Sequence, residues 1–376
     1  MIINIATGPW LPVPAVQGGA IPRLWQGLAE EFAARGHKVR ILCRSYPGQP
    51  QTEVINGVEY IRRGGLPQST NIILDLLKDF FYGLLTFPTL PPADILVIND
   101  FWLPVFAALR PQVGHIVVNA ARFPKGQYRL YTGVARFAAV STAVQEAIVQ
   151  EYPSAIRKTK VIPNPIDTSI FSPATQPKLE KKEKVILYVG RIHPEKGVHL
   201  LLNAFSILSQ QINTVKLRII GPVKENQGGG GETYLRNLHF IAEGLNVEFL
   251  EPIFDVHKLA EAYREADIFC YPSLAEKGES FGVAPLEAMA SGLVPVVSSL
   301  NCFNDFIEEG RTGCFFEHSS PEATKKLATA LKLAICNPDK IEKMSFQARH
   351  KASDFSYEKI ASLYISAFEE LLNNKS

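Results

Sequence analysis

Two carboxylates placed around the start of a helix are the residues in this sequence best suited to hold a sugar. Glu279 and Glu287 are separated by seven residues in the segment Gly-Glu-Ser-Phe-Gly-Val-Ala-Pro-Leu-Glu. Each carboxylate oxygen accepts O–H bonds, which suits vicinal hydroxyl groups. Three backbone N–H groups at the expected helix start would suit a phosphate, namely those of Phe281, Gly282 and Val283. The segment therefore predicts a site for sugar hydroxyls and phosphate together.

A second segment contributes positive charge. Arg191 and Lys196 follow Gly190 at the end of an expected strand, Val185–Val189, and precede a helix. A guanidinium offers a fork of donors and an ammonium offers a point charge, so the pair would suit a diphosphate. In isolation, ordinary surface charge explains the two cations equally well.

A glycine pair follows the first expected strand. Gly18 and Gly19 precede a helical pattern at Arg23–Arg35, and paired glycines let backbone N–H groups approach a ligand closely. The sequence holds no G-x-G-x-x-G, which argues against a dinucleotide-binding dehydrogenase.

These segments sit in two series of strands and helices. Short apolar runs alternate with helical patterns, which indicates βαβ units and two doubly wound parallel sheets. We expect an N-terminal domain at 1–165, a linker at 166–184, a C-terminal domain at 185–355, and a final helix at 356–376 that packs back on the first domain. Ligands bind at the carboxyl ends of such strands, so we expect a cleft between two facing domains. We interpret the tetraglycine at 228–231 as an exposed connection.

Composition limits the function. The 376 residues carry a net charge of +2, so nucleic acid is not an expected partner. Residues 1–165 hold 16 Lys and Arg against 10 Asp and Glu, whereas the remainder holds 23 against 27. The five cysteines are scattered, and neither a signal peptide nor a run of about 20 apolar residues is evident. We expect a cytoplasmic protein, either free or peripheral at the inner face of a membrane.

One helical pattern has two interpretations. Eight apolar residues recur at helical spacing: Ile72, Ile73, Leu76, Leu77, Phe80, Phe81, Leu84 and Leu85. We favour packing of this face on the N-terminal sheet. The alternative is contact with an acceptor or a membrane.

Taken in order, these motifs resemble the retaining glycosyltransferases of family 4, which have the GT-B fold. The resemblance covers essentially the whole chain and rests on the glycine pair, on G-R-x-x-x-E-K-G from Gly190, and on E-x-F-G-x-x-x-L-E-A-M-A-x-G from Glu279. The opening segment is also similar, more weakly, to a subgroup associated with spore coats and surface polysaccharides. The resemblance implies a hexosyltransferase with a nucleotide-diphosphate sugar as donor, UDP-sugar rather than GDP-sugar, and no cofactor or metal.

The resemblance also implies roles for individual residues. Arg191 and Lys196 would hold the diphosphate, Glu287 the ribose and Glu279 the donor sugar. The glycine pair and the 281–283 amides would complete the site, and the base would lie near Ile253. Many relatives carry a histidine just after the strand that matches residues 117–119, near the reacting sugar. Here Asn119 could still hydrogen-bond a sugar hydroxyl, and Arg122 or Lys125 could meet an anionic acceptor. The acceptor, whether a glycan, a lipid-linked sugar or a small molecule, is not indicated.

Three alternatives remain at this stage. Gly278-Glu-Ser280-Phe-Gly282 matches G-x-S-x-G, and Asp305 and His318 follow in the order of an α/β-hydrolase. The hydrolase motif requires the serine directly after a strand, whereas residues 272–277 intervene here. A GT-B sugar-nucleotide epimerase and a non-catalytic donor-binding scaffold are the other two.

Overall fold

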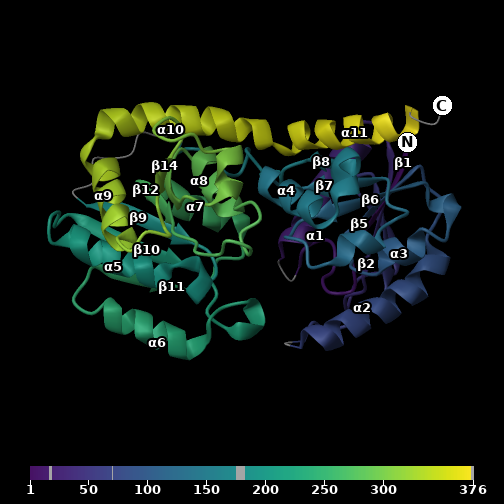
Figure 1. The fold of residues 1–376 in the computed structure, drawn as a ribbon, viewed down its shortest axis with the longest axis horizontal. Helices are drawn as coiled ribbons and strands as arrows, with labels where there is room; N and C mark the ends of the chain where they lie inside the picture. Colours follow the sequence, from purple (N-terminus) through teal and green to yellow (C-terminus); the bar gives the residue numbers. More distant parts are fainter. Residues whose placement is uncertain (17–18, 70, 175–182, 374–376) are drawn as a thin grey trace. The chain divides into compact units, whose positions relative to one another are not determined.

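The computed structural model describes residues 1–16, 19–69, 71–174 and 183–373, which form two compact units. Unit 1 consists of Met1–Pro165 together with the C-terminal segment that begins at Tyr357. Unit 2 is Ile166–Ser356. Figure 1 shows that each unit consists of a β-sheet with helices packed beside it. Within the described ranges, no helix combines the length and the apolar character needed to cross a bilayer.

Unit 1 contains an eight-stranded sheet in the order β3-β4-β2-β1-β5-β6-β7-β8. The strands are β1 Ile2–Ala6, β2 Lys38–Arg44, β3 Thr52–Ile55, β4 Val58–Arg63, β5 Ile95–Ile98, β6 His115–Ala120, β7 Arg136–Ala139 and β8 Thr159–Val161. All neighbours pair in parallel except β3 with β4, which form an antiparallel hairpin. The helices are α1 Ala20–Ala34, α2 Ile72–Thr86, α3 Leu103–Ala107, α4 Thr142–Glu151 and α11 Tyr357–Asn373.

Unit 2 contains a six-stranded, wholly parallel sheet in the order β11-β10-β9-β12-β13-β14. Its strands are β9 Lys184–Val189, β10 Val215–Ile220, β11 Val247–Leu250, β12 Ile268–Tyr271, β13 Val294–Ser298 and β14 Cys314–Phe316. Its helices are α5 Val198–Ser209, α6 Gly231–Ile241, α7 Val256–Glu265, α8 Val283–Ala290, α9 Ala323–Cys336 and α10 Pro338–Ala352. The two series of strands and helices read from the sequence are thus two separate sheets with helical crossovers.

Aromatic packing fixes the last helix to unit 1. Trp25 and Phe32 of α1 are fully buried and contact Tyr364 of α11, at ring-centroid distances of 5.4 and 6.3 Å. Phe368 packs on Phe32 at 5.9 Å. Rings of this size bury much apolar area and prefer tilted or edge-on contacts, so this cluster holds α11 in place.

The first part of the expected linker belongs to unit 2. The Ile166 amide donates to the Phe355 carbonyl at 2.8 Å, and the ring of Phe171 packs edge-on against Tyr263 at 5.8 Å. Residues 166–174 of the expected 166–184 linker therefore group with unit 2, and Lys184 begins β9. Linker residues 175–182 lie outside the described residues.

The helical pattern near residue 80 forms α2, but its orientation corrects our favoured interpretation. Six of its eight apolar residues are exposed rather than packed on the sheet: Ile72, Ile73, Leu77, Phe81, Leu84 and Leu85. The side of α2 that packs inward carries Asp79, Tyr82, Gly83 and Thr86. Hydrogen bonds explain why the polar side of α2 packs inward: Asp79 accepts from the backbone N–H groups of Phe101 and Trp102.

Candidate active site

A buried ion pair joins the two motifs at the carboxyl end of the unit 2 sheet. Lys196 lies in a short 3₁₀ turn after β9, and Glu279 lies in the segment between β12 and α8. Lys196 Nζ is 2.7 Å from Glu279 Oε2, and the two residues are only 5% and 8% exposed. The structure thus brings together a cation and a carboxylate that are 83 residues apart in sequence.

Arg191 extends this pair into a charged network. Its guanidinium contacts Glu195 Oε1 at 2.5 Å and donates to the Gly228 carbonyl at 2.8 Å. Glu195 is also 3.9 Å from Lys196. Burial opposes ionisation of Glu195, but the hydrogen bond from Arg191 and the nearby cations hold the pKa of Glu195 below its usual value. Glu195 was not among the predicted site residues, although it stands inside the G-R-x-x-x-E-K-G motif.

The tetraglycine segment has a structural role that the sequence did not reveal. Gly228 anchors Arg191, and Gly231 begins α6. The segment is partly or fully buried, so its interpretation as an exposed connection is wrong. A side chain at Gly229 would place Cβ 2.1 Å from the Val223 carbonyl oxygen, which explains the need for glycine there.

Two stacked tyrosines lie beneath the ion pair. The rings of Tyr188 and Tyr271 are 5.8 Å apart and nearly parallel, at 10°, and Lys196 Nζ is 5.9 Å from the Tyr271 ring centre. Burial raises the pKa of both tyrosines well above the usual value, and the neighbouring Glu279 carboxylate raises it further. Both phenols therefore stay neutral. The low dielectric around the two buried rings strengthens the electrostatic interaction between Lys196 and Glu279.

Helix α8 begins at Val283, within the helix start expected at residues 281–283. Gly282 precedes the helix with a φ of 86°, a left-handed conformation that favours glycine. The side chain of Phe281 is buried against Phe306 and Phe355, at 5.2 and 6.0 Å, and this packing fixes the segment leading into the helix. Val283, the first helical residue, is half-buried. An anion at this end would meet the positive end of the helix dipole.

Glu287 is held by a tyrosine that sequence reasoning missed. Its Oε2 accepts a hydrogen bond of 3.0 Å from the Tyr263 hydroxyl of α7. Tyr263 is fully buried, and burial, followed by the proximity of Glu287, raises its pKa well above the usual value. Glu287 itself is half-buried on α8, so it keeps an accessible side while Tyr263 restrains it.

Other predicted donor-site residues lie in the same unit. Gly190 directly follows β9, and an added Cβ there would lie 2.9 Å from the Tyr188 hydroxyl. Ile253 is half-buried in the loop between β11 and α7, next to the exposed Phe254. The residues predicted to bind the donor therefore lie on the loops and helix starts that follow strands β9, β11 and β12.

Unit 1 contains the remaining predicted residues. Gly19 caps the start of α1, and Gly18 lies outside the described residues. Asn119, at the end of β6, is buried and donates to Asn99 Oδ1 at 2.8 Å, an atom that also accepts from Trp25 at 2.7 Å. Arg122, two residues past β6, is exposed. The structure therefore brings Asn119, but not Arg122, into a buried amide network, whose partners Asn99 and Trp25 were not predicted.

The hydrolase alternative lacks its required geometry. Ser280 lies nine residues after the end of β12 rather than at a strand-to-helix elbow. The ring of His318 instead contacts the Ser299 hydroxyl and Glu276, each at 3.1 Å. A nucleophilic Ser280 activated by His318 is therefore not supported.

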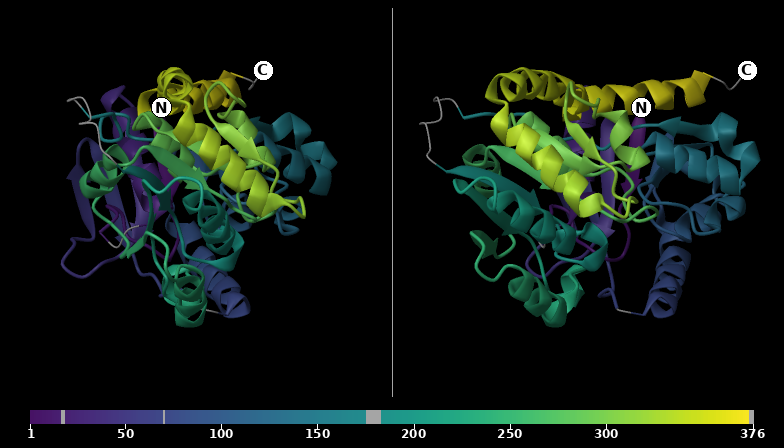
Figure 2. Two further views of the ribbon diagram at one scale, coloured as in Figure 1. Left: turned by 90° about the vertical axis from the view of Figure 1, so that its left-hand side faces the viewer. Right: turned by 60° about the vertical axis from the view of Figure 1, so that its left-hand side comes forward.

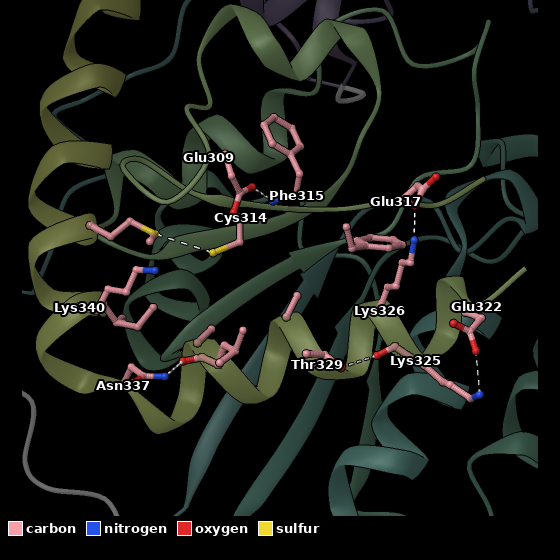
Figure 3. Close-up of a pocket in the computed structure, with 16 residues that line it drawn as sticks. Glu309, Cys314, Phe315, Glu317, Glu322, Lys325, Lys326, Thr329, Asn337 and Lys340 are labelled. Atoms are coloured by element: carbon pink, nitrogen blue, oxygen red, sulfur yellow. Dashed lines mark hydrogen bonds and ion pairs between the residues drawn. The ribbon is translucent and has the colours of Figure 1, made fainter. Parts of the chain in front are cut away.

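A cavity of about 600 Å³ lies elsewhere in unit 2, between β14, α9 and α10. Figure 3 shows its mixed lining, in which Lys325 faces Glu322 and Lys326 faces Glu317. None of the predicted donor-site residues lines it. Within the described ranges, no three His, Cys, Asp or Glu residues are grouped so as to hold a metal ion.

Comparison with known families agrees with this geometry. The family model for glycosyl transferases group 1 matches residues 173–351, and the model for glycosyltransferase family 4 matches residues 21–170. The family 4 match corresponds to unit 1 and the group 1 match to unit 2, and together they span most of the chain. The chain belongs to glycosyltransferase family 4. It is a glycosyltransferase, and its two sheets are those of the GT-B fold.

Relatives within this glycosyltransferase class are distant. Spore coat protein SA of Bacillus subtilis is 25% identical over 96% of this chain and 97% of its own length. A D-inositol 3-phosphate glycosyltransferase of Geodermatophilus obscurus is 30% identical over 62% of this chain. The chain spans only 53% of that relative's length, so the similarity alone does not transfer its substrates.

Solved structures share the fold of this family 4 chain. Sucrose-phosphate synthase from Thermosynechococcus elongatus aligns over 100% of both chains with a TM-score of 0.77 and 20% identity. Anabaena HepE, solved in complex with UDP and glucose, aligns over 98% of this chain and 100% of its own with a TM-score of 0.71 and 17% identity.

Proposed function

We propose that this glycosyltransferase takes a sugar from a nucleotide-diphosphate donor held by unit 2 and transfers it with retention of configuration. The observation that carries the proposal is the buried pair of Lys196 and Glu279, linked to Arg191 through Glu195. Two cations at the carboxyl end of a parallel sheet, beside a helix start, suit a diphosphate. Glu279 and Glu287 supply acceptors for sugar and ribose hydroxyls.

The ion pairs give the site a defined way to bind an anion. Without a ligand, Lys196 and Arg191 are each neutralised by a carboxylate, which keeps a buried charge from standing alone. An incoming diphosphate would share or replace these partners. Glu279 would then turn its second oxygen to a donor-sugar hydroxyl while staying near Lys196.

The transfer step needs no enzyme-derived nucleophile. The bond between the sugar C1 and the phosphate oxygen breaks as the acceptor oxygen bonds to C1 on the same face. The proton of the acceptor hydroxyl passes to the departing phosphate oxygen. Lys196, Arg191 and the α8 amides would stabilise the negative charge that develops on that phosphate.

UDP is the nucleotide that we favour. HepE, which shares the fold, was solved with UDP and with UDP-glucose. We further propose that transfer requires no metal, because the sequence has no Asp-x-Asp and the two cations can neutralise the diphosphate. The acceptor is unassigned.

A ligand screen tests the proposal. Melting temperature and turnover should be measured with UDP, GDP and a panel of their sugars, each with and without EDTA. A donor at about 100 times its Kd should raise the free energy of unfolding by roughly 2.7 kcal/mol, unchanged by EDTA. Sugar-nucleotide isomerisation without transfer would indicate an epimerase, and binding without turnover a scaffold. Loss of binding with EDTA would contradict metal independence.

A further inference from the structure

Helix α2 turns its apolar side to solvent. Seven of its side chains are between 40% and 74% exposed: Ile72, Ile73, Leu74, Leu77, Phe81, Leu84 and Leu85. At 100° per residue, all but the first fall within an arc of about 120°. Figures 1 and 2 show α2 at the periphery of unit 1, with the sheet on one side of it only. We call these seven residues the α2 face.

The charged residues of α2 are held away from this face. Asp75 accepts hydrogen bonds from the backbone N–H and the hydroxyl of Ser69, at 2.9 and 2.8 Å. Lys78 donates to the Pro67 carbonyl at 2.8 Å. Asp79 is buried under the Phe101 and Trp102 amides. Three fixed polar contacts therefore prevent the helix from rolling its apolar side inward.

Aromatic packing holds the helix firmly enough to present that face. Phe80 contacts the rings of Trp102 and Phe106 at 5.5 and 5.2 Å, and the Trp102 indole N–H donates to the Leu76 carbonyl at 3.1 Å. Gly83 allows close approach, since an added Cβ there would lie 3.1 Å from the Phe106 ring. The exposed apolar side is thus a built feature of the fold.

The chemistry of the α2 face fits hydrocarbon better than protein. Its side chains are aliphatic apart from Phe81, and they carry no nitrogen or oxygen atom. Protein interfaces are usually anchored by Tyr, Trp, Arg or Met with hydrogen bonds at the rim. A 15-residue helix with one wholly apolar side instead matches the geometry of helices that lie in the plane of a bilayer surface.

The distribution of charge between the two units indicates that the bilayer surface is anionic. Unit 1, which includes α2, holds 18 Lys and Arg against 13 Asp and Glu, whereas unit 2 holds 21 against 24. The excess of positive charge therefore belongs to the unit that carries the apolar face. Anionic lipid headgroups would attract this unit and leave unit 2 without such attraction.

We propose that α2 docks unit 1 on an anionic lipid bilayer, with the α2 face inserted among the acyl chains. Insertion would remove the exposed aliphatic side chains from water, and the net positive charge of unit 1 would add attraction to the headgroups. The proposal does not depend on the identity of the donor or on sugar transfer. It would place unit 1 where a lipid-linked molecule could reach it.

Vesicle co-sedimentation tests the proposal directly. The full chain should be mixed with vesicles of pure phosphatidylglycerol and, separately, of pure phosphatidylcholine. We expect binding to phosphatidylglycerol, reduced on phosphatidylcholine. Phe81→Glu should weaken binding about tenfold or more, because a side chain of this size is worth at least that factor when buried. Phe240→Glu is the matched control, since Phe240 is 78% exposed on α6 of unit 2.

Three outcomes would overturn the proposal. The first is that the wild-type chain binds neither kind of vesicle. The second is that Phe81→Glu and Phe240→Glu bind vesicles equally well. The third is that the wild-type chain binds no lipid but forms a dimer, which Phe81→Glu dissociates. The last result would assign the face to a second copy of this chain. Both positions are exposed, so both variants should keep the wild-type melting temperature and the same response to UDP. This response separates failure at the membrane from failure of the proposed donor site.

Discussion

The carboxyl ends of the two parallel sheets carry different chemistry. In unit 2 they lead to a charged network of Arg191, Lys196 and Glu279. In unit 1 they lead to a neutral amide network, in which Asn119 and Trp25 both donate to Asn99. We propose that the unit 2 end binds the anion of the donor and that the unit 1 end binds uncharged hydroxyl groups of the acceptor. Variants on the two sides should consequently affect donor and acceptor separately.

The largest effect is expected at Glu279. Glu279→Gln removes the carboxylate nearest the proposed donor sugar and leaves the buried Lys196 with only the more distant carboxylate of Glu195. We expect kcat to fall by about 10- to 1,000-fold, or about 1.4–4 kcal/mol of barrier, in saturating-donor kinetics.

A double variant separates contact with the sugar from support of Lys196. If Glu279 only positions the lysine, Lys196→Ala with Glu279→Gln should be no slower than Lys196→Ala alone. An additional loss in the double variant supports a direct role. Melting curves must accompany these assays, because removing one partner of a buried pair costs about 3–5 kcal/mol of stability.

A smaller effect is expected at Glu287. Its proposed ribose contact lies far from the bond that breaks, so it should be equally strong in ground and transition states. Glu287→Gln should raise the donor KM by about three- to tenfold with little change in kcat. Tyr263→Phe, which removes the hydroxyl that restrains Glu287, should change KM in the same direction. A loss confined to kcat would exchange the roles of the two carboxylates.

On the other side of the comparison, Asn119→Ala should affect the acceptor. The amide oxygen of Asn119 is buried and has no hydrogen-bond partner within the described residues. We expect kcat/KM for the acceptor to fall by about three- to tenfold, the value of one hydrogen bond, with UDP affinity unchanged. Titration with UDP checks the second part, and weaker UDP binding would place Asn119 on the donor side.

The smallest expected effect concerns two buried carboxyl groups, that of Asp79 on α2 and that of Asp100 after β5. Burial raises the pKa of Asp79 to about 6, and burial together with Asp79 raises the pKa of Asp100. Between the ordinary pKa of 3.8 and about 6, the folded chain binds more protons at Asp79 than the unfolded chain does. The contribution of Asp79 to the free energy of unfolding should therefore fall as pH rises through this window and level off above it.

Asp79→Asn removes this dependence while keeping an oxygen that can accept from the Phe101 and Trp102 amides. Relative to wild type, the variant should gain about 2–4 °C in Tm between about pH 4 and about pH 7. Asp339→Asn, at an exposed position of α10, supplies the control. If the Tm difference between Asp79→Asn and wild type were the same at every pH, as is expected for Asp339→Asn, the prediction would be contradicted.

Strong local patterns made much of the fold predictable. Strand β9, expected at Val185–Val189, begins one residue earlier at Lys184, and helix α1, expected at Arg23–Arg35, spans Ala20–Ala34. Both were predictable because β9 is a continuous apolar run and α1 is a periodic segment. The β3 strand was missed, although Asn56-Gly57 between β3 and β4 is a hairpin signal. Strands β8 and β14 have only three residues each and leave too little pattern to detect.

Contacts between distant segments were not predictable. The motifs indicated a cation at Lys196 and a carboxylate at Glu279, but the ion pair depends on where β9 and β12 bring their loops. Tyr263 could not be assigned to Glu287 for the same reason. The predicted orientation of α2 was wrong because the periodicity of the sequence identifies an apolar side without showing which side of the helix packs on the sheet. The buried contacts of Asp79 decide that.

Binding of UDP, UMP and uridine to Lys196→Ala tests the central claim most directly. Wild-type chain should bind UDP more tightly than UMP, and Lys196→Ala should lose about 10- to 150-fold in UDP affinity, or about 1.5–3 kcal/mol, with little change for uridine. Lys326→Ala, which removes a lysine paired with Glu317 outside the site, should bind all three as wild type does. Calorimetric titration that finds the UDP preference intact in Lys196→Ala would contradict the assignment of this buried ion pair to the donor diphosphate.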